Sequence, residues 1–167
     1  MPATAAIAQL GHRYTMCVES LLGVPSRFHD ANGRVVATAE LSREWDGLLE
    51  LDGHQYGFSV GVDTSEIRDR MNGRRAMASS LDDIIVIVGT GKAPDRYELV
   101  ATGPDRFGLY RRDRNVSVLN HVRIGHRIET VNETSTPAMI GLLATLIVAF
   151  APPHYTRESG PRALTRS

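Results

Sequence analysis

The stretch TPAMIGLLATLIVAFAPP, residues 136–153, is the most apolar part of this chain. Thr136 is a favourable N-cap residue and Pro137 suits the first helical position, while the closing pair of prolines cannot continue a helix. The sequence therefore predicts a helix over residues 137–151 that is apolar on almost every side. Such a helix lies either in lipid or inside a protein core.

The length of this segment favours a core position. Residues 138–151 would extend about 21 Å at about 1.5 Å per residue. A bilayer core is about 30 Å thick and needs about 20 apolar residues. An interfacial helix would need a charged face, which this segment lacks. We therefore expect a buried helix, with a short membrane anchor as the alternative.

The rest of the chain reads as short strands separated by turns. Residues 13–132 show strand-like alternation at roughly 10-residue spacing, which is typical of an all-β barrel or sandwich. Turns are expected at DANG (residues 30–33), at residues 52–53 and over Asp113–Asn115. DDIIVIVGTG reads as a buried strand. The arginine-rich stretch DTSEIRDRMNGRRAMAS, residues 63–79, lacks a clear period, and we predict a long loop there, with at most one helical turn.

A helix that is apolar all round, in a chain of antiparallel strands, fits best at the centre of a closed barrel, because a two-layer sandwich would cover only one of its sides. The predicted fold is therefore mainly β: a closed antiparallel β-barrel of about 10–12 strands around a hydrophobic C-terminal α-helix. We expect one domain over residues 13–153. A flexible N-terminus (1–12) and a flexible C-terminal tail (154–167) would flank it.

Three stretches, in order, carry a family resemblance. RYTMCVESLLGVPSRFHDANGRVVATAEL contains an F-x-D-x-x-G-x-x-V hairpin at Phe28, Asp30, Gly33 and Val36. RFGLYRRDRNVSVLNHVRI resembles a later repeat of that hairpin, and IETVNETSTPAMIGLLATLIVAFA resembles a last strand, an acidic link and a closing helix. Over residues 13–151 the pattern resembles the tubby C-terminal-like family, which includes the LURP-one-related proteins and the phospholipid scramblases.

The resemblance implies a barrel closed around its C-terminal helix and a non-enzymatic role. Some tubby-like domains bind phosphoinositide headgroups through basic residues on the barrel surface, and scramblases are associated with lipid movement and calcium. The resemblance thus implies a binding or scaffold domain, with an anionic lipid, a membrane surface or another protein as its partner. We expect no catalytic residues and no cofactor.

Five arginines are the candidate anion-binding residues. They are Arg111, Arg112, Arg114, Arg123 and Arg127. If GLYRRDRN and LNHVRIGHR form adjacent strands, several guanidinium groups gather on one face, where they would grip phosphate oxygens with paired hydrogen bonds. The hypothesis is binding to phosphorylated or anionic lipid headgroups, and a solvated hairpin with scattered charges is the alternative.

A second hypothesis is a small barrel enzyme or ligand carrier with a pocket at the barrel mouth. It would use His54, Tyr56, His121 or His126. The five-residue spacing of His121 and His126 predicts opposite faces of a strand, and no histidine pair has helical metal-binding spacing, so we expect no metal site. Cys17 reads as a buried small side chain.

Composition sets broad limits on partners and location. The formal net charge is +0, which gives no global attraction to nucleic acid, and no nucleic-acid partner is expected. One cysteine excludes an internal disulfide framework and fits a reducing compartment. The first residues lack the pattern of a secretory signal. We expect a cytoplasmic protein, peripheral to the membrane if it binds lipid, and the sequence does not specify an oligomeric state.

Overall fold

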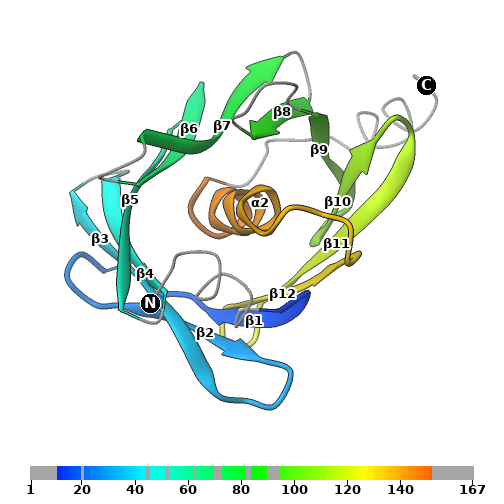
Figure 1. Ribbon diagram of the computed structural model, residues 1–167. Coiled ribbons are helices and arrows are strands. Elements are labelled where there is room, and N and C mark those ends of the chain that lie inside the picture. The colour runs from blue at the N-terminus through cyan, green and yellow to red at the C-terminus, as the bar shows by residue number, and fades with distance from the viewer. Residues whose placement is uncertain are drawn as a thin grey trace.

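The fold is a closed antiparallel barrel of twelve strands around a C-terminal helix, α2 (Ala138–Phe150), as Figure 1 shows. The structure is a computed structural model that describes residues 11–19, 21–43, 46–51, 53–61, 63–69, 73–81, 84–89 and 95–151. The predicted fold class is therefore confirmed. The observed helix is one residue shorter at each end than the predicted range of 137–151.

The strands follow one another around the barrel in sequence order. They are β1 (Arg13–Cys17), β2 (Ser26–Asp30), β3 (Val35–Arg43), β4 (Asp46–Leu51), β5 (His54–Val60), β6 (Thr64–Asp69), β7 (Gly73–Leu81), β8 (Ile84–Gly89), β9 (Arg96–Gly103), β10 (Arg106–Arg111), β11 (Arg114–Val122) and β12 (Arg127–Asn132).

Pairing of the first strand with the last closes the sheet. Tyr14 of β1 lies opposite Asp30 of β2 on one side and opposite Thr130 of β12 on the other. Because every neighbouring pair is antiparallel, the connections between strands alternate between the two ends of the barrel. The chain enters α2 from the end of β12, so we name the two ends the α2 N-terminal end and the α2 C-terminal end. The β1–β2 and β11–β12 connections lie at the α2 C-terminal end.

The helix lies inside the barrel, and residues 139–148 are all buried. The ring of Phe150, the last residue of α2, stacks on the ring of Phe58, with 6.1 Å between the ring centroids. The predicted core position is thus confirmed. No helix among the described residues has the length and apolar character needed to cross a membrane.

Polar contacts inside the barrel fix the helix against β1 and β12. The Thr145 hydroxyl lies 3.1 Å from the Tyr14 hydroxyl and 3.0 Å from that of Thr130. It also donates to the carbonyl of Gly141 in its own helix at 2.9 Å. All three hydroxyl-bearing side chains are buried, so each contact satisfies groups that would otherwise lose their hydrogen bonds with water.

The predicted loop over residues 63–79 is wrong, because the described residues of this segment form β6 and most of β7. In β6 the buried positions are Ser65, Ile67 and Asp69, and only Ile67 is a large apolar residue. In β7 the positions facing α2 include alanines, since the helix already fills the lumen. A strand whose buried positions are polar or small carries little of the alternation by which strands are predicted.

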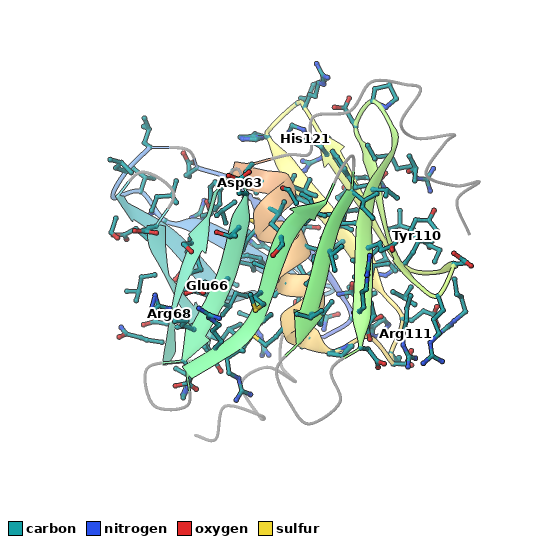
Figure 2. All side chains as sticks on the ribbon, turned by 90° about the horizontal axis from the view of Figure 1, so that it is seen from above. Asp63, Glu66, Arg68, Tyr110, Arg111 and His121 are labelled. Atoms are coloured by element: carbon teal, nitrogen blue, oxygen red, sulfur yellow. The ribbon has the colours of Figure 1, made fainter. Side chains whose placement is uncertain are left out.

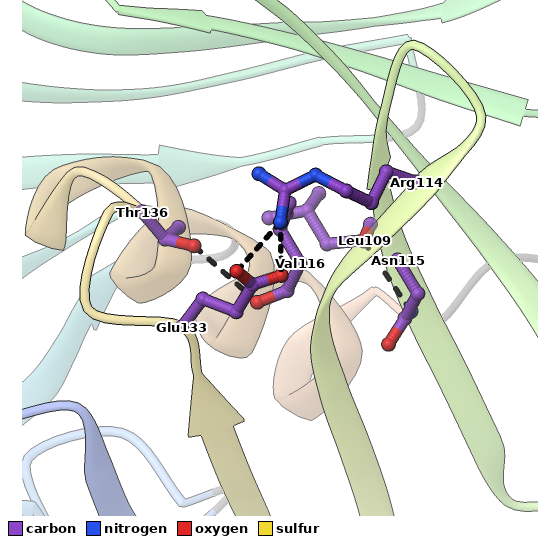
Figure 3. Close-up of polar contacts among 6 residues, drawn as sticks. All are labelled: Leu109, Arg114, Asn115, Val116, Glu133 and Thr136. Atoms are coloured by element: carbon purple, nitrogen blue, oxygen red, sulfur yellow. Dashed lines mark hydrogen bonds and ion pairs between the residues drawn. The ribbon is translucent and has the colours of Figure 1, made fainter.

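Two local predictions also need correction. Thr136 does not cap the helix: its hydroxyl donates to the carbonyl of Val116 on β11 at 3.3 Å, and Pro137 is the N-cap residue (Figure 3). The β10–β11 turn lies at Arg112 and Asp113, whose φ angles are 51° and 68°. The prediction placed it over residues 113–115.

The predicted flexible ends lie mostly outside the described residues. Residues 1–10 and 152–167 are not described. His12 belongs to the predicted flexible N-terminus, but it is described. Its backbone carbonyl accepts a hydrogen bond from the backbone N–H of Asn132 at 2.7 Å, which continues the β1–β12 pairing by one residue.

Candidate functional site

The barrel divides the five candidate arginines between its two ends. Arg111, Arg112 and Arg114 lie at the β10–β11 turn, at the α2 N-terminal end. Arg123 and Arg127 lie at the β11–β12 turn, at the α2 C-terminal end. The nine residues of β11 separate the two groups by about 30 Å. Figure 2 shows the same separation between the labelled Arg111 and His121, near opposite ends of the barrel.

Three of these arginines are held by carboxylates. Arg111 pairs with Asp95 at 3.0 Å. The Arg114 Nη1 donates to both carboxylate oxygens of Glu133, at 2.7 and 2.8 Å (Figure 3).

The Arg123 Nε donates to both carboxylate oxygens of Asp105 at 2.9 Å. The five arginines therefore do not form the single anion-binding face that the sequence suggested.

The four side chains of the predicted barrel-mouth pocket form two separate pairs. At the α2 N-terminal end, the rings of His54 and Tyr56 lie 4.8 Å apart. His54 Nε2 lies 3.3 Å from a carboxylate oxygen of Asp69, a buried residue. The buried Tyr56 hydroxyl makes no hydrogen bond within the described part of the chain. Burial and the Asp69 carboxylate raise the pKa of Tyr56.

The second pair, His121 and His126, lies at the α2 C-terminal end. The prediction that these two residues occupy opposite faces of a strand is wrong, because β11 ends at Val122 and the chain then turns back. Nε2 of His121 lies 3.0 Å from Nδ1 of His126. Burial and the proximity of His126 lower the pKa of His121. A pocket at one mouth of the barrel cannot contain both pairs.

A shallow groove of about 580 Å³ lies on the outer wall over β4, β5 and β6. Its floor includes Gly57, where an added Cβ would meet no atom within 4 Å. Leu48, Glu66 and Arg68 line it, and Tyr56 is the one member of the predicted pocket that does so. Arg68 and Arg74 both pair with Glu66, so these charges largely neutralise one another.

The most exposed large apolar side chains mark a different site. Ile124 is 88% exposed, Leu21 67% and Leu22 60%, which are the three highest values for such residues in the described part of the chain. Ile124 lies in the β11–β12 turn, and the two leucines lie in the β1–β2 loop (residues 18–25). Both connections lie at the α2 C-terminal end.

The barrel closure makes these two connections neighbours. The Val18 amide, at the start of the β1–β2 loop, donates to the carbonyl of His126 at 2.9 Å. Cys17 and Arg127, one residue away on each chain segment, are register partners in β1 and β12. The apolar tips of the two loops therefore project from one end of the molecule. We call them the paired loops.

Basic side chains stand beside the paired loops on the outer wall. Cys17 lies between Arg127 of β12 and Arg27 of β2 in the register of the sheet. No ion pair holds Arg27 or Arg127 among the residues that the structure describes. Cys17 is only half-buried, contrary to the prediction, and its Sγ lies 3.7 Å from Nδ1 of His29.

Sequence reasoning did not single out Leu21, Leu22, Ile124 or Arg27. The available signal was two adjacent leucines and an isoleucine placed next to glycines, in segments that read as turns rather than strands. Large apolar residues at turn positions have no core to enter, so their exposure was foreseeable. Their proximity was not.

Within the described ranges, no group of three or more His, Cys, Asp and Glu residues is placed to hold a metal ion.

In comparisons with known proteins, no family model, curated protein or solved structure matches this chain. The paired loops and the arginines beside them are therefore the candidate functional site.

Proposed function

We propose that this protein is a non-catalytic domain that binds the surface of anionic membranes through the paired loops. One observation carries the proposal: Leu21, Leu22 and Ile124 project from neighbouring loops at one end of the barrel, with Arg27 and Arg127 beside them. Apolar tips that enter the lipid interface and basic side chains that meet anionic headgroups are the two components of peripheral membrane binding.

The expected strength is modest and reversible. Partial burial of three large aliphatic side chains contributes on the order of 3 kcal/mol, at about 25 cal/mol per Å² of apolar surface removed from water. Each arginine near an anionic surface adds about 1 kcal/mol. The sum, roughly 5 kcal/mol, supports attachment that depends on lipid charge and weakens with salt.

The proposal keeps part of the predicted binding set and replaces the rest. Arg123 and Arg127 lie at the proposed contact, whereas Arg111, Arg112 and Arg114 lie at the other end of the barrel and would face away from the bilayer. We also propose that the protein is related to the tubby C-terminal-like proteins and that it is located in the cytoplasm. The sequence pattern and the barrel around a C-terminal helix support the proposed relationship.

Vesicle flotation tests the proposal directly. We expect the protein to float with phosphatidylcholine vesicles that contain phosphatidylserine, and to stay largely unbound with phosphatidylcholine alone. The triple change Leu21→Ser, Leu22→Ser and Ile124→Ser should weaken binding at least tenfold, which corresponds to about 1.4 kcal/mol. The folded barrel should survive, because all three side chains are exposed.

Two matched controls use the opposite end of the barrel. Val35→Ser removes an apolar side chain that is 48% exposed at the start of β3, and binding should not change. Arg111→Ala with Arg112→Ala removes as much charge as Arg27→Ala with Arg127→Ala, yet only the second pair should weaken binding. Failure to float with anionic vesicles, or equal losses from both arginine pairs, would refute the proposed surface.

A further inference from the structure

A histidine pair lies at the connection between β11 and β12: His121 is near the end of β11, and His126 follows Ile124 by two residues in the turn. Nε2 of His121 and Nδ1 of His126 lie 3.0 Å apart, a hydrogen-bond distance. One of these nitrogens must donate a proton and the other must accept it with a lone pair. The contact therefore holds only while at least one of the two rings is neutral.

His126 also holds the turn in an uncommon backbone conformation. Its φ angle is 45°, in the left-handed region that non-glycine residues rarely adopt. Its amide donates to the carbonyl of Arg123 at 3.1 Å, and its carbonyl accepts from Val18 of the β1–β2 loop. The histidine contact and these backbone bonds together fix Ile124 relative to the neighbouring loop.

The charges around the pair come from three other elements as well as from the turn. Asp105 of the β9–β10 turn lies 3.9 Å from Nδ1 of His121 and favours protonation. Burial, His126 and, to a lesser extent, Arg123 of the same turn oppose the protonation of His121 and lower its pKa. Arg127 follows His126 at the start of β12, and Glu19 follows Val18 in the β1–β2 loop.

We propose that the His121–His126 contact is a pH-sensitive latch on the paired loops, and that its protonation strengthens binding to anionic membranes. This inference rests on the proposed function. When both rings are charged, all four ring nitrogens carry protons, so the hydrogen bond is replaced by repulsion between two cations. The turn is then free to leave its left-handed conformation, and the contact end of the barrel gains positive charge.

The charge gain sets the size of the effect. Added positive charge near an anionic surface strengthens attachment by a factor of about five for each unit. Acidification from about pH 7.5 to about pH 5.5 spans the ordinary histidine range. Because burial lowers the pKa of His121, its protonation is incomplete in this interval and the gain lies between one and two charges. We therefore expect binding to phosphatidylserine-containing vesicles to strengthen about tenfold.

The experiment compares vesicle binding at the two pH values for the full chain and three variants. His126→Asn suits the left-handed backbone and cannot take the second proton, because Asn tolerates positive φ better than most residues. His121→Gln tests the other ring without altering the turn backbone. His54→Gln is the matched control at the opposite end. NMR titration of the imidazole protons reports protonation without lipid.

The latch predicts that His126→Asn and His121→Gln bind with little pH dependence, while His54→Gln keeps the tenfold response. In the NMR titration, the pKa of His121 should rise towards its ordinary value in His126→Asn, because a neighbouring charge is lost. Native protein that binds equally at both pH values would overturn the latch and leave the membrane function standing. Native protein that binds at neither pH would overturn both. A full pH response in His126→Asn would show that another group titrates, and would overturn the latch.

Discussion

Replacement of Gly141 by alanine tests how tightly α2 fits inside the barrel. Gly141 faces Asn132 of β12, and an added Cβ would lie 2.6 Å from Nδ2 and 2.8 Å from Oδ1 of that side chain. Asn132 is buried, and its Oδ1 accepts a hydrogen bond from the Ser117 hydroxyl at 2.5 Å. The amide cannot move aside without the loss of a bond between two buried groups.

Three effects set the magnitude. Alanine in a helix is favoured over glycine by about 1 kcal/mol. Overpacking of a close-fitting core costs about 1–3 kcal/mol. Loss of the Ser117–Asn132 bond leaves buried polar groups unsatisfied, at a cost of about 1–3 kcal/mol. The net expectation for Gly141→Ala is a loss of about 1–5 kcal/mol, with a central value near 3.

Urea unfolding measures this loss, and thermal unfolding should show a midpoint lower by roughly 10 °C for a loss of about 3 kcal/mol. Gly89→Ala is the control, because its Cβ would meet Cδ1 of Ile140 at 3.6 Å, an ordinary contact, so stability should be nearly unchanged. In a protein that already carries Asn132→Ala, the change Gly141→Ala should lose most of its destabilising effect, because the side chain that it clashes with is absent. A Gly141→Ala protein as stable as the native one, or more stable, would refute the proposed fit.

Two tyrosines give the remaining predictions. Tyr14→Phe should lower the free energy of unfolding by about 0.5–1.5 kcal/mol, because it removes the bond to Thr145, whereas Tyr56→Phe should cost nothing or stabilise, because its buried hydroxyl makes no bond in the described structure. Urea unfolding of both variants checks this, and a greater loss for Tyr56→Phe contradicts it. Burial raises the pKa of Tyr14 from 10.0 to about 12, so its contribution to stability is complete below pH 10 and is lost as pH rises towards 12. Between pH 10 and pH 12 the free energy of unfolding should fall more steeply with pH for the native protein than for Tyr14→Phe. Equal pH dependence in the two proteins would contradict the raised pKa of Tyr14.

The sequence was most informative where one local property decided the outcome. A helix apolar on every face but too short for a bilayer had to be enclosed by the chain's own strands, and residues 139–148 are indeed buried. Turns with glycine at positive φ were also visible, as at Gly33 and Gly53. The segment 63–79 was misread because the interior positions of β6 and β7 hold polar and small residues. Their suitability depends on α2, which fills the lumen, and on His54, which pairs with Asp69.

By itself, the sequence determined the fold class, the enclosed helix and the presence of arginines and exposed apolar turns. These follow from periodicity and local propensity, which act over a few residues. The tertiary structure decided which of these residues meet. Closure of β1 on β12 joins loops about a hundred positions apart in the chain, and a nine-residue strand separates arginines that are close in sequence. Distance along the chain does not fix distance in space once a sheet closes on itself, so the proposed contact surface could be located only in the folded barrel.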